Sequence, residues 1–72
     1  MKYRELLQEG TEQLKKAAIA DAEVDAAYLL EYVCGIDRTH YLLCMTETVP
    51  PQMAARYEEA IALRATHQPL QY

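Results

Sequence analysis

The sequence predicts an all-α fold, a compact bundle of four or five helices. Apolar residues recur every three or four positions in its long segments, which is the period of one face of a helix. No segment shows the strict alternation of apolar and polar residues that is typical of a half-buried strand. The aromatic residues are all Tyr, since Phe and Trp are absent. The core therefore depends on Leu, Ala, Tyr and Met, which suit packed helices better than a sheet.

The first predicted helix spans residues 3–18. Lys15 and Lys16 lie in its last turn, where cations interact favourably with the helix dipole. Gly10 lies on the apolar stripe, and a glycine there predicts the close approach of a neighbouring helix. The other members of this stripe are Tyr3, Leu6, Leu7, Leu14, Ala17 and Ala18.

The second predicted helix spans residues 22–34 after a short connection at residues 19–20. Asp21 is the expected N-cap, and Gly35 the expected left-handed C-cap. Apolar residues lie on most sides of this segment, which predicts a central, buried helix. Asp25 is an acid within it, so we expect a capping or pairing role near the helix start.

A short third helix is predicted at residues 38–44, with Asp37 as its cap. Residues 45–49 then form a loop. The fourth helix begins near Pro51, because a proline ring is preset for the first turn, and it continues to about His67. These elements make one domain over residues 1–67. Pro69 stops the helix. Residues 68–72 end abruptly in apolar and aromatic side chains, and we interpret them as the start of a linker to a missing domain.

Composition excludes several classes of function. Eleven acidic residues against seven basic ones give a net charge of −4, and the basic residues do not cluster. Direct nucleic-acid binding is therefore not expected. No segment reaches the roughly 20 apolar residues of a membrane span, and the N-terminus has no apolar run of a signal peptide. The expected compartment is the cytoplasm, with no membrane contact.

The residues with reactive or metal-binding side chains do not form a recognisable site. Cys34, His40, Cys44 and His67 lack the close pairs of a structural zinc site. In a reducing cytoplasm the two cysteines are best interpreted as small buried apolar residues. Binding of a nucleotide or a methyl donor needs a glycine-rich turn between a strand and a helix, and this sequence has none. We expect no catalytic, cofactor-binding or metal site in this chain.

Three short motifs, in order, resemble those of a known family. Residues 25–30 resemble the D-A-x-x-L-L segment, and residues 35–38 the G-x-x-R turn, of the PrmC/HemK family of protein-(glutamine-N5) methyltransferases. Arg64 followed by residues 69–72 resembles the R-x₄-P-L-Q-Y stretch that closes the helical domain of that family. The sequence departs from the family pattern in having Leu63 before Arg64, where two basic residues are frequent, and His67 near the place of a glycine.

The resemblance implies the N-terminal domain of a two-domain enzyme. The second domain of that family binds S-adenosylmethionine and uses an N-P-P-Y motif to methylate the glutamine of the G-G-Q loop in peptide-chain release factors. That motif does not occur in these 72 residues, so no catalytic residue can be transferred to this sequence. The helical domain would dock the release factor and contact its own C-terminal catalytic domain, which is a positioning role.

Two exposed places are the expected contacts with a partner or with the catalytic domain. They are the start of the third helix, with Arg38 and Thr39, and the end of the fourth, with Arg64, His67 and Gln68. Arginine suits such contacts because its guanidinium can bind a carboxylate through two hydrogen bonds. An alternative function is an independent helical protein–protein interaction module. A helix-turn-helix DNA-binding function is disfavoured by the acidic charge balance.

Overall fold

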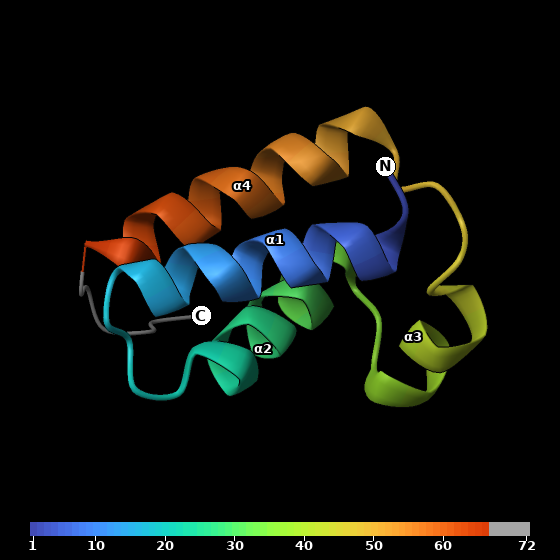
Figure 1. Ribbon diagram of the computed structural model, residues 1–72. Coiled ribbons are helices and arrows are strands. Elements are labelled where there is room, and N and C mark those ends of the chain that lie inside the picture. Colours follow the sequence, from blue (N-terminus) through green and yellow to red (C-terminus); the bar gives the residue numbers. More distant parts are fainter. Residues whose placement is uncertain (67–72) are drawn as a thin grey trace.

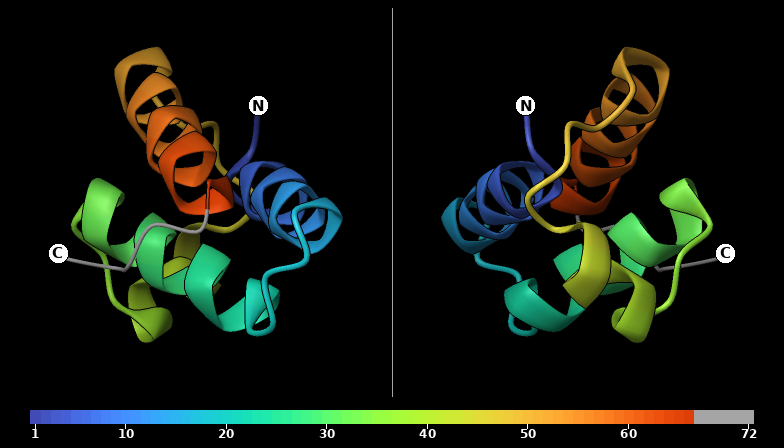
Figure 2. Two further views of the ribbon diagram at one scale, coloured as in Figure 1. Left: turned by 90° about the vertical axis from the view of Figure 1, so that its left-hand side faces the viewer. Right: turned by 90° about the vertical axis from the view of Figure 1, so that its right-hand side faces the viewer.

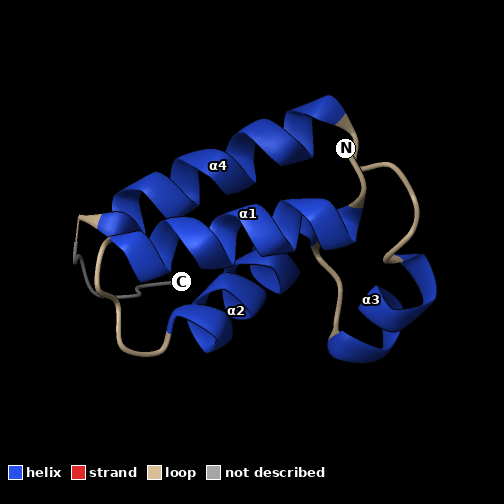
Figure 3. Ribbon diagram, in the orientation of Figure 1, coloured by secondary structure: helices blue, strands red, loops and turns tan. Residues whose placement is uncertain are grey.

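The computed structural model describes residues 1–66, which contain four helices and no strand (Figure 3). The helices are α1 (Tyr3–Lys16), α2 (Ala22–Cys34), α3 (Arg38–Cys44) and α4 (Pro51–Ala65). The predicted all-α bundle of four or five helices is confirmed. α4 begins at Pro51 as predicted and ends at Ala65, slightly before the predicted end. The predicted linker at residues 68–72 lies outside the described residues.

The three long helices pack on one another, and α3 lies at one end of the bundle. In Figure 1, α1 and α4 run in the same general direction and α2 returns beneath them. α1 contacts both α2 and α4, and α2 also contacts α4. The views in Figure 2 show α4 and α2 on different sides of α1. α3 and the C-terminal end of α4 therefore lie at opposite ends of the molecule (Figure 1).

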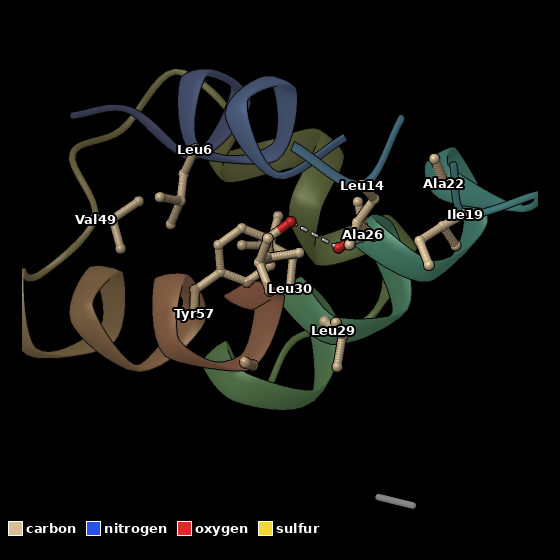
Figure 4. Close-up of a cluster of buried hydrophobic side chains, with 11 residues drawn as sticks. Leu6, Leu14, Ile19, Ala22, Ala26, Leu29, Leu30, Val49 and Tyr57 are labelled. Atoms are coloured by element: carbon tan, nitrogen blue, oxygen red, sulfur yellow. Dashed lines mark hydrogen bonds between the residues drawn. The ribbon is translucent and has the colours of Figure 1, made fainter. Parts of the chain in front are cut away.

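The core lies where the three long helices meet (Figure 4). Its largest fully buried side chains are Tyr57, Leu6, Leu14, Leu29, Leu30 and Ile61. The Tyr57 hydroxyl donates a hydrogen bond of 2.9 Å to the backbone carbonyl of Ala26, so its polar end is satisfied inside the core. A Cβ added at Gly10 would lie 2.9 Å from two carbons of the Tyr57 ring. The close approach predicted from Gly10 is therefore confirmed, and α4 is the helix that approaches.

The start of α1 is capped by a segment that is distant in sequence. The Tyr3 and Arg4 amides donate to the carbonyls of Glu47 and Met45, at 3.1 and 3.0 Å. The Glu5 carboxylate accepts a 2.7 Å hydrogen bond from the Lys2 amide. The loop predicted at residues 45–49 thus has a structural task, because it satisfies amide donors that the first turn of a helix leaves free.

Predictions for the helix ends are partly right. Gly35 caps α2 in the left-handed conformation, at φ 66°, and the Asp37 carboxylate accepts a 2.7 Å hydrogen bond from the His40 amide, as expected. The predicted extension of α1 to residue 18 is wrong, because Ala18 is also left-handed, at φ 62°, and α1 ends at Lys16. Asp21 occupies the N-cap position of α2 as predicted, but its side chain accepts no hydrogen bond from the helix.

The prediction that α2 is buried on nearly all sides is also wrong. Ala22, Asp25, Ala26, Leu29 and Leu30 are buried against α1 and α4. The opposite side of the helix carries three exposed apolar residues, which are Val24, Tyr28 and Tyr32. Because the other long helices cover only one side of α2, the remaining apolar side chains lie at the surface.

Candidate interaction surface

An ion pair joins α2 to the end of α4. Arg64 Nε donates to Asp25 Oδ2 at 2.9 Å, and the two side chains are 21% and 10% exposed. Asp25 is the buried charged residue of the core, and charges are tolerated there only when they are paired. The pairing role expected for Asp25 is therefore found, and its partner lies 39 residues further along the chain.

This ion pair and the Tyr57 hydrogen bond act on neighbouring residues of α2. Arg64 binds Asp25, and Tyr57 binds the carbonyl of Ala26. Arg64 and Tyr57 lie two turns apart on α4, on the side that packs against α2. The two polar contacts thus fix the position of α4 along α2, which apolar contacts alone specify less strictly.

The α3 side of the molecule has a hollow of about 170 Å³. α1 contributes Leu7, and α2 contributes Ala27, Leu30 and Glu31. α3 contributes Arg38 together with Tyr41 and Leu42, which follow it by three and four positions and therefore lie on the same side of that helix. A cavity of about 150 Å³ holds a benzene ring, so this hollow has room for one apolar side chain.

A second hollow adjoins the first along α2. Ala27, Glu31 and Arg38 line both hollows, and Glu23, Val24 and Tyr28 complete the second. The two hollows form one continuous area, which we name the α2–α3 surface and define by Val24, Ala27, Tyr28, Glu31, Arg38 and Leu42. Arg38 is the one basic residue that lines it, among the residues that the structure describes.

The sequence-predicted contact residues do not come together. Arg38 lies in the α2–α3 surface, and Thr39 is exposed beside it at the start of α3. Arg64 is half-buried in its ion pair near the other end of the molecule, so it is less open to solvent than the sequence suggested. His67 and Gln68 lie outside the described residues.

The apolar part of this surface was missed by the sequence analysis. The apolar side chains of α2 gave no signal of exposure, because they read as the circumference of a buried helix. Leu42 belongs to a short helix, in which no stripe could be recognised. Only the arrangement of the helices shows which of these residues are exposed.

The cysteines show no feature of an activated nucleophile. Burial raises the pKa of the Cys34 thiol, and the neighbouring Cys44 raises it further. A raised pKa disfavours the reactive thiolate form. Within residues 1–66, no group of three or more His, Cys, Asp and Glu side chains could hold a metal ion. None of the helices in this part of the chain is long and apolar enough to cross a membrane.

Comparison with known proteins identifies a family. The family model described as the PrmC N-terminal domain matches residues 5–72. The chain is 42% identical over all 72 residues to a release factor glutamine methyltransferase of Deinococcus radiodurans, of which it covers 26%. It is 36% identical over 70 residues to the protein of that name from Cereibacter sphaeroides, covering 97% of this chain and 25% of the relative. No solved structure matches the chain.

A third relative gives the same result. The release factor glutamine methyltransferase of Moorella thermoacetica is 32% identical over 72 residues, which is all of this chain and 25% of the relative. The chain therefore spans about a quarter of the length of these curated relatives.

Proposed function

This chain belongs to the family of PrmC N-terminal domains, and we propose that it is the substrate-docking domain of a release factor glutamine methyltransferase. The observation that carries the proposal is sequence similarity to proteins of that name, at 42% and 32% identity over all 72 residues of this chain. Because the chain covers only a quarter of those relatives, the proposal assigns methyl transfer to a longer protein. A release factor substrate would place that protein in the cytoplasm.

The described residues do not fit the methyl donor, S-adenosylmethionine, that the proposed enzyme would use. A site of that kind is built on a glycine-rich turn between a strand and a helix. Gly10 packs against Tyr57 in the middle of α1, and Gly35 caps α2. Neither glycine lies in such a turn. We assign no step of methyl transfer to residues 1–66 and place cofactor binding in the remainder of the longer protein.

A docking domain has to hold its partner at a fixed distance from the reacting group, and the bundle is built for that task. The Asp25–Arg64 ion pair and the Tyr57–Ala26 hydrogen bond fix the end of α4 against α2. Any domain that follows α4 is then attached to a rigid base. Holding a substrate in the correct orientation can supply a large part of a rate acceleration without any bond chemistry.

The first test is a titration of the isotope-labelled 72-residue chain with a bacterial peptide-chain release factor, followed by NMR. We expect saturable shifts and a dissociation constant of about tens of micromolar or weaker, because one contact of a two-contact attachment need not be tight. The absence of any shift at high release factor concentration would contradict the docking function.

A second test uses the longer reading frame. We expect it to encode a glycine-rich methyl-donor motif followed by N-P-P-Y. Deletion of residues 1–66 from that longer protein should raise KM for the release factor much more than it changes the affinity for S-adenosylmethionine. Equal activity with and without these residues would show that the domain does not contribute to docking.

A further inference from the structure

Five large apolar side chains are exposed over α2 and α3. Val24 is 67% exposed, Tyr28 42%, Tyr32 55%, Leu42 59% and Leu43 79%. Val24, Tyr28 and Tyr32 follow one another at intervals of four residues, so they form a stripe along the outer side of α2. Contiguous exposed apolar groups in a small domain mark a surface that another protein covers, and Tyr is among the residues enriched in such interfaces.

The charged residues of the α2–α3 surface indicate which kind of partner it accepts. The Arg38 side chain is exposed, lines both hollows, and makes no hydrogen bond or ion pair within the residues that the structure describes. Glu23, at the far edge of the second hollow, is paired with Lys15 at 3.4 Å. A partner with an apolar side chain beside a carboxylate could therefore fill the hollow and bind the Arg38 guanidinium, which suits a carboxylate well.

The position of the first hollow argues for a separate molecule as its occupant. It lies between α3 and the first half of α1, because Leu7 and Leu42 both line it. α4 ends at Ala65, at the opposite end of a molecule that is 29 Å long (Figure 1). In the longer protein proposed above, a domain that follows α4 would be joined at the Asp25–Arg64 end of the bundle, so we take a different protein as the occupant of the hollow at the α3 end.

We propose that the α2–α3 surface is the place where the release factor docks, and that it accepts a release factor segment whose apolar side chain enters the hollow while a neighbouring carboxylate pairs with Arg38. This inference rests on the proposed docking function and adds the face and the chemistry of the contact. Arg38 and Leu42 have separate roles in it. Leu42 supplies apolar contact, and Arg38 selects an acidic neighbour and sets the orientation of the segment.

The experiment repeats the NMR titration with variants of the 72-residue chain. Leu42→Ser removes apolar contact, and Arg38→Glu reverses the charge. Both positions are exposed at the start and middle of α3, so helix content measured by circular dichroism should stay unchanged. Leu63→Ser is the matched control, because Leu63 is 48% exposed on α4 and lines neither hollow. We expect each of the first two changes to raise the dissociation constant about tenfold, as central interface residues do, and the control to leave it unchanged.

The outcomes separate this inference from the proposed function. Binding that is intact in Leu42→Ser and Arg38→Glu, or tighter in Arg38→Glu, would overturn the docking face while leaving the docking function standing. No binding of the unsubstituted chain would overturn both. Shifts of Val24, Tyr28 and Leu42 that depend on the concentration of the chain alone, without release factor, would assign the surface to a second copy and overturn the inference. Shifts confined to these residues on addition of the release factor would support it.

Discussion

The contact between Gly10 and Tyr57 shows how one absent side chain determines the packing of two helices. The Tyr57 ring occupies the space where a Cβ of residue 10 would lie, and its hydroxyl donates a hydrogen bond to the Ala26 carbonyl on α2. The ring therefore cannot move away without losing a buried hydrogen bond. Glycine weakens the middle of α1 as an isolated helix, and the contact with Tyr57 compensates for this.

We expect Gly10→Ala to destabilise the chain by about 1–3 kcal/mol, the usual cost of overpacking a core. Helix propensity alone would predict a gain of about 1 kcal/mol, so the sign of the effect tests the contact. Urea denaturation of the two proteins measures it. In a Tyr57→Leu background, where the ring is absent, the same substitution should be neutral or stabilising. Equal effects in both backgrounds would show that Tyr57 is not the group that Gly10 accommodates.

The Asp25–Arg64 ion pair gives a second prediction for single residues. Asp25→Ala leaves the guanidinium in a half-buried position without its carboxylate, and we expect a loss of about 2 kcal/mol, between the values for exposed and fully buried pairs. The double variant Asp25→Ala, Arg64→Ala should be less destabilised than the sum of the single variants. Additive losses in a double-mutant cycle would mean that the two side chains do not interact. Charge reversal at Arg64 is a poor test of docking, because it would place two carboxylates together.

For single residues, the sequence predicted the role of a side chain better than it predicted which residue that side chain contacts. The apolar segment around Asp25 indicated that this acid needs a partner, because a buried charge is costly when unpaired. Nothing in the spacing of the residues identified Arg64, since that contact depends on the crossing of α2 and α4. Arg64 was accordingly predicted as a surface contact. Arg64 forms an ion pair with Asp25. A contact between Arg64 and a partner protein stays a prediction.

Two helix ends share one backbone arrangement but have different residues in it. After α1, the Ile19 amide donates to the Leu14 carbonyl and the Ala18 amide to that of Lys15, each at 3.0 Å, with Ala18 left-handed. After α2, the Ile36 amide donates to the Glu31 carbonyl at 3.0 Å, with Gly35 left-handed. The end at Gly35 could be predicted, because glycine favours this conformation. The end at Ala18 could not, because alanine continues a helix readily.

The two left-handed residues, Ala18 and Gly35, allow opposite substitutions to be compared. Ala18→Gly should stabilise the chain by about 1 kcal/mol, because the left-handed conformation is strained for a residue with a Cβ. Gly35→Ala should destabilise it by a similar amount, and through the backbone alone, since a Cβ at residue 35 would meet no atom within 4 Å. Thermal unfolding of both variants measures the two effects. Shifts of the same sign would contradict the assignment of one conformation to both positions.

The misassigned side of α2 is also explained at the element scale. A helix that is apolar on most sides is buried when neighbours surround it, and among the described helices the main contacts of α2 are with α1 and α4. A chain of this length buries only about 60% of the surface that its unfolded state would expose. It cannot cover every apolar side chain of its central helix. The candidate interaction surface is therefore a consequence of the size of the domain as much as of its sequence.

For the whole molecule, the buried tyrosine predicts how stability depends on pH. Burial raises the pKa of Tyr57 well above its ordinary value, and the neighbouring Cys34 and Tyr41 raise it further. Burial also raises the pKa of Tyr3, of Tyr41 and of the Cys34 thiol. The unfolded chain releases the thiol proton near pH 8.5 and the tyrosine protons near pH 10, whereas the folded chain retains them to higher pH. Stability is consequently complete below about pH 8, falls slightly as the pH passes about 8.5 and falls more steeply above about 10, because the unfolded state then binds fewer protons than the folded state.

We expect the urea midpoint of this chain to be constant between about pH 7 and 8, to fall slightly towards pH 9 as the Cys34 thiol titrates in the unfolded chain, and to fall steeply between pH 10 and 11, with each fully retained proton contributing about 1.4 kcal/mol per pH unit. Tyr57→Phe is the informative comparison. It should cost about 1 kcal/mol at neutral pH, because the hydrogen bond to Ala26 is lost. It should also make the fall above pH 10 shallower, because residue 57 no longer titrates in the unfolded state. If the stability of both proteins fell with the same slope against pH, alkaline unfolding would depend on other groups. The raised pKa of the Tyr57 hydroxyl would then not be its cause.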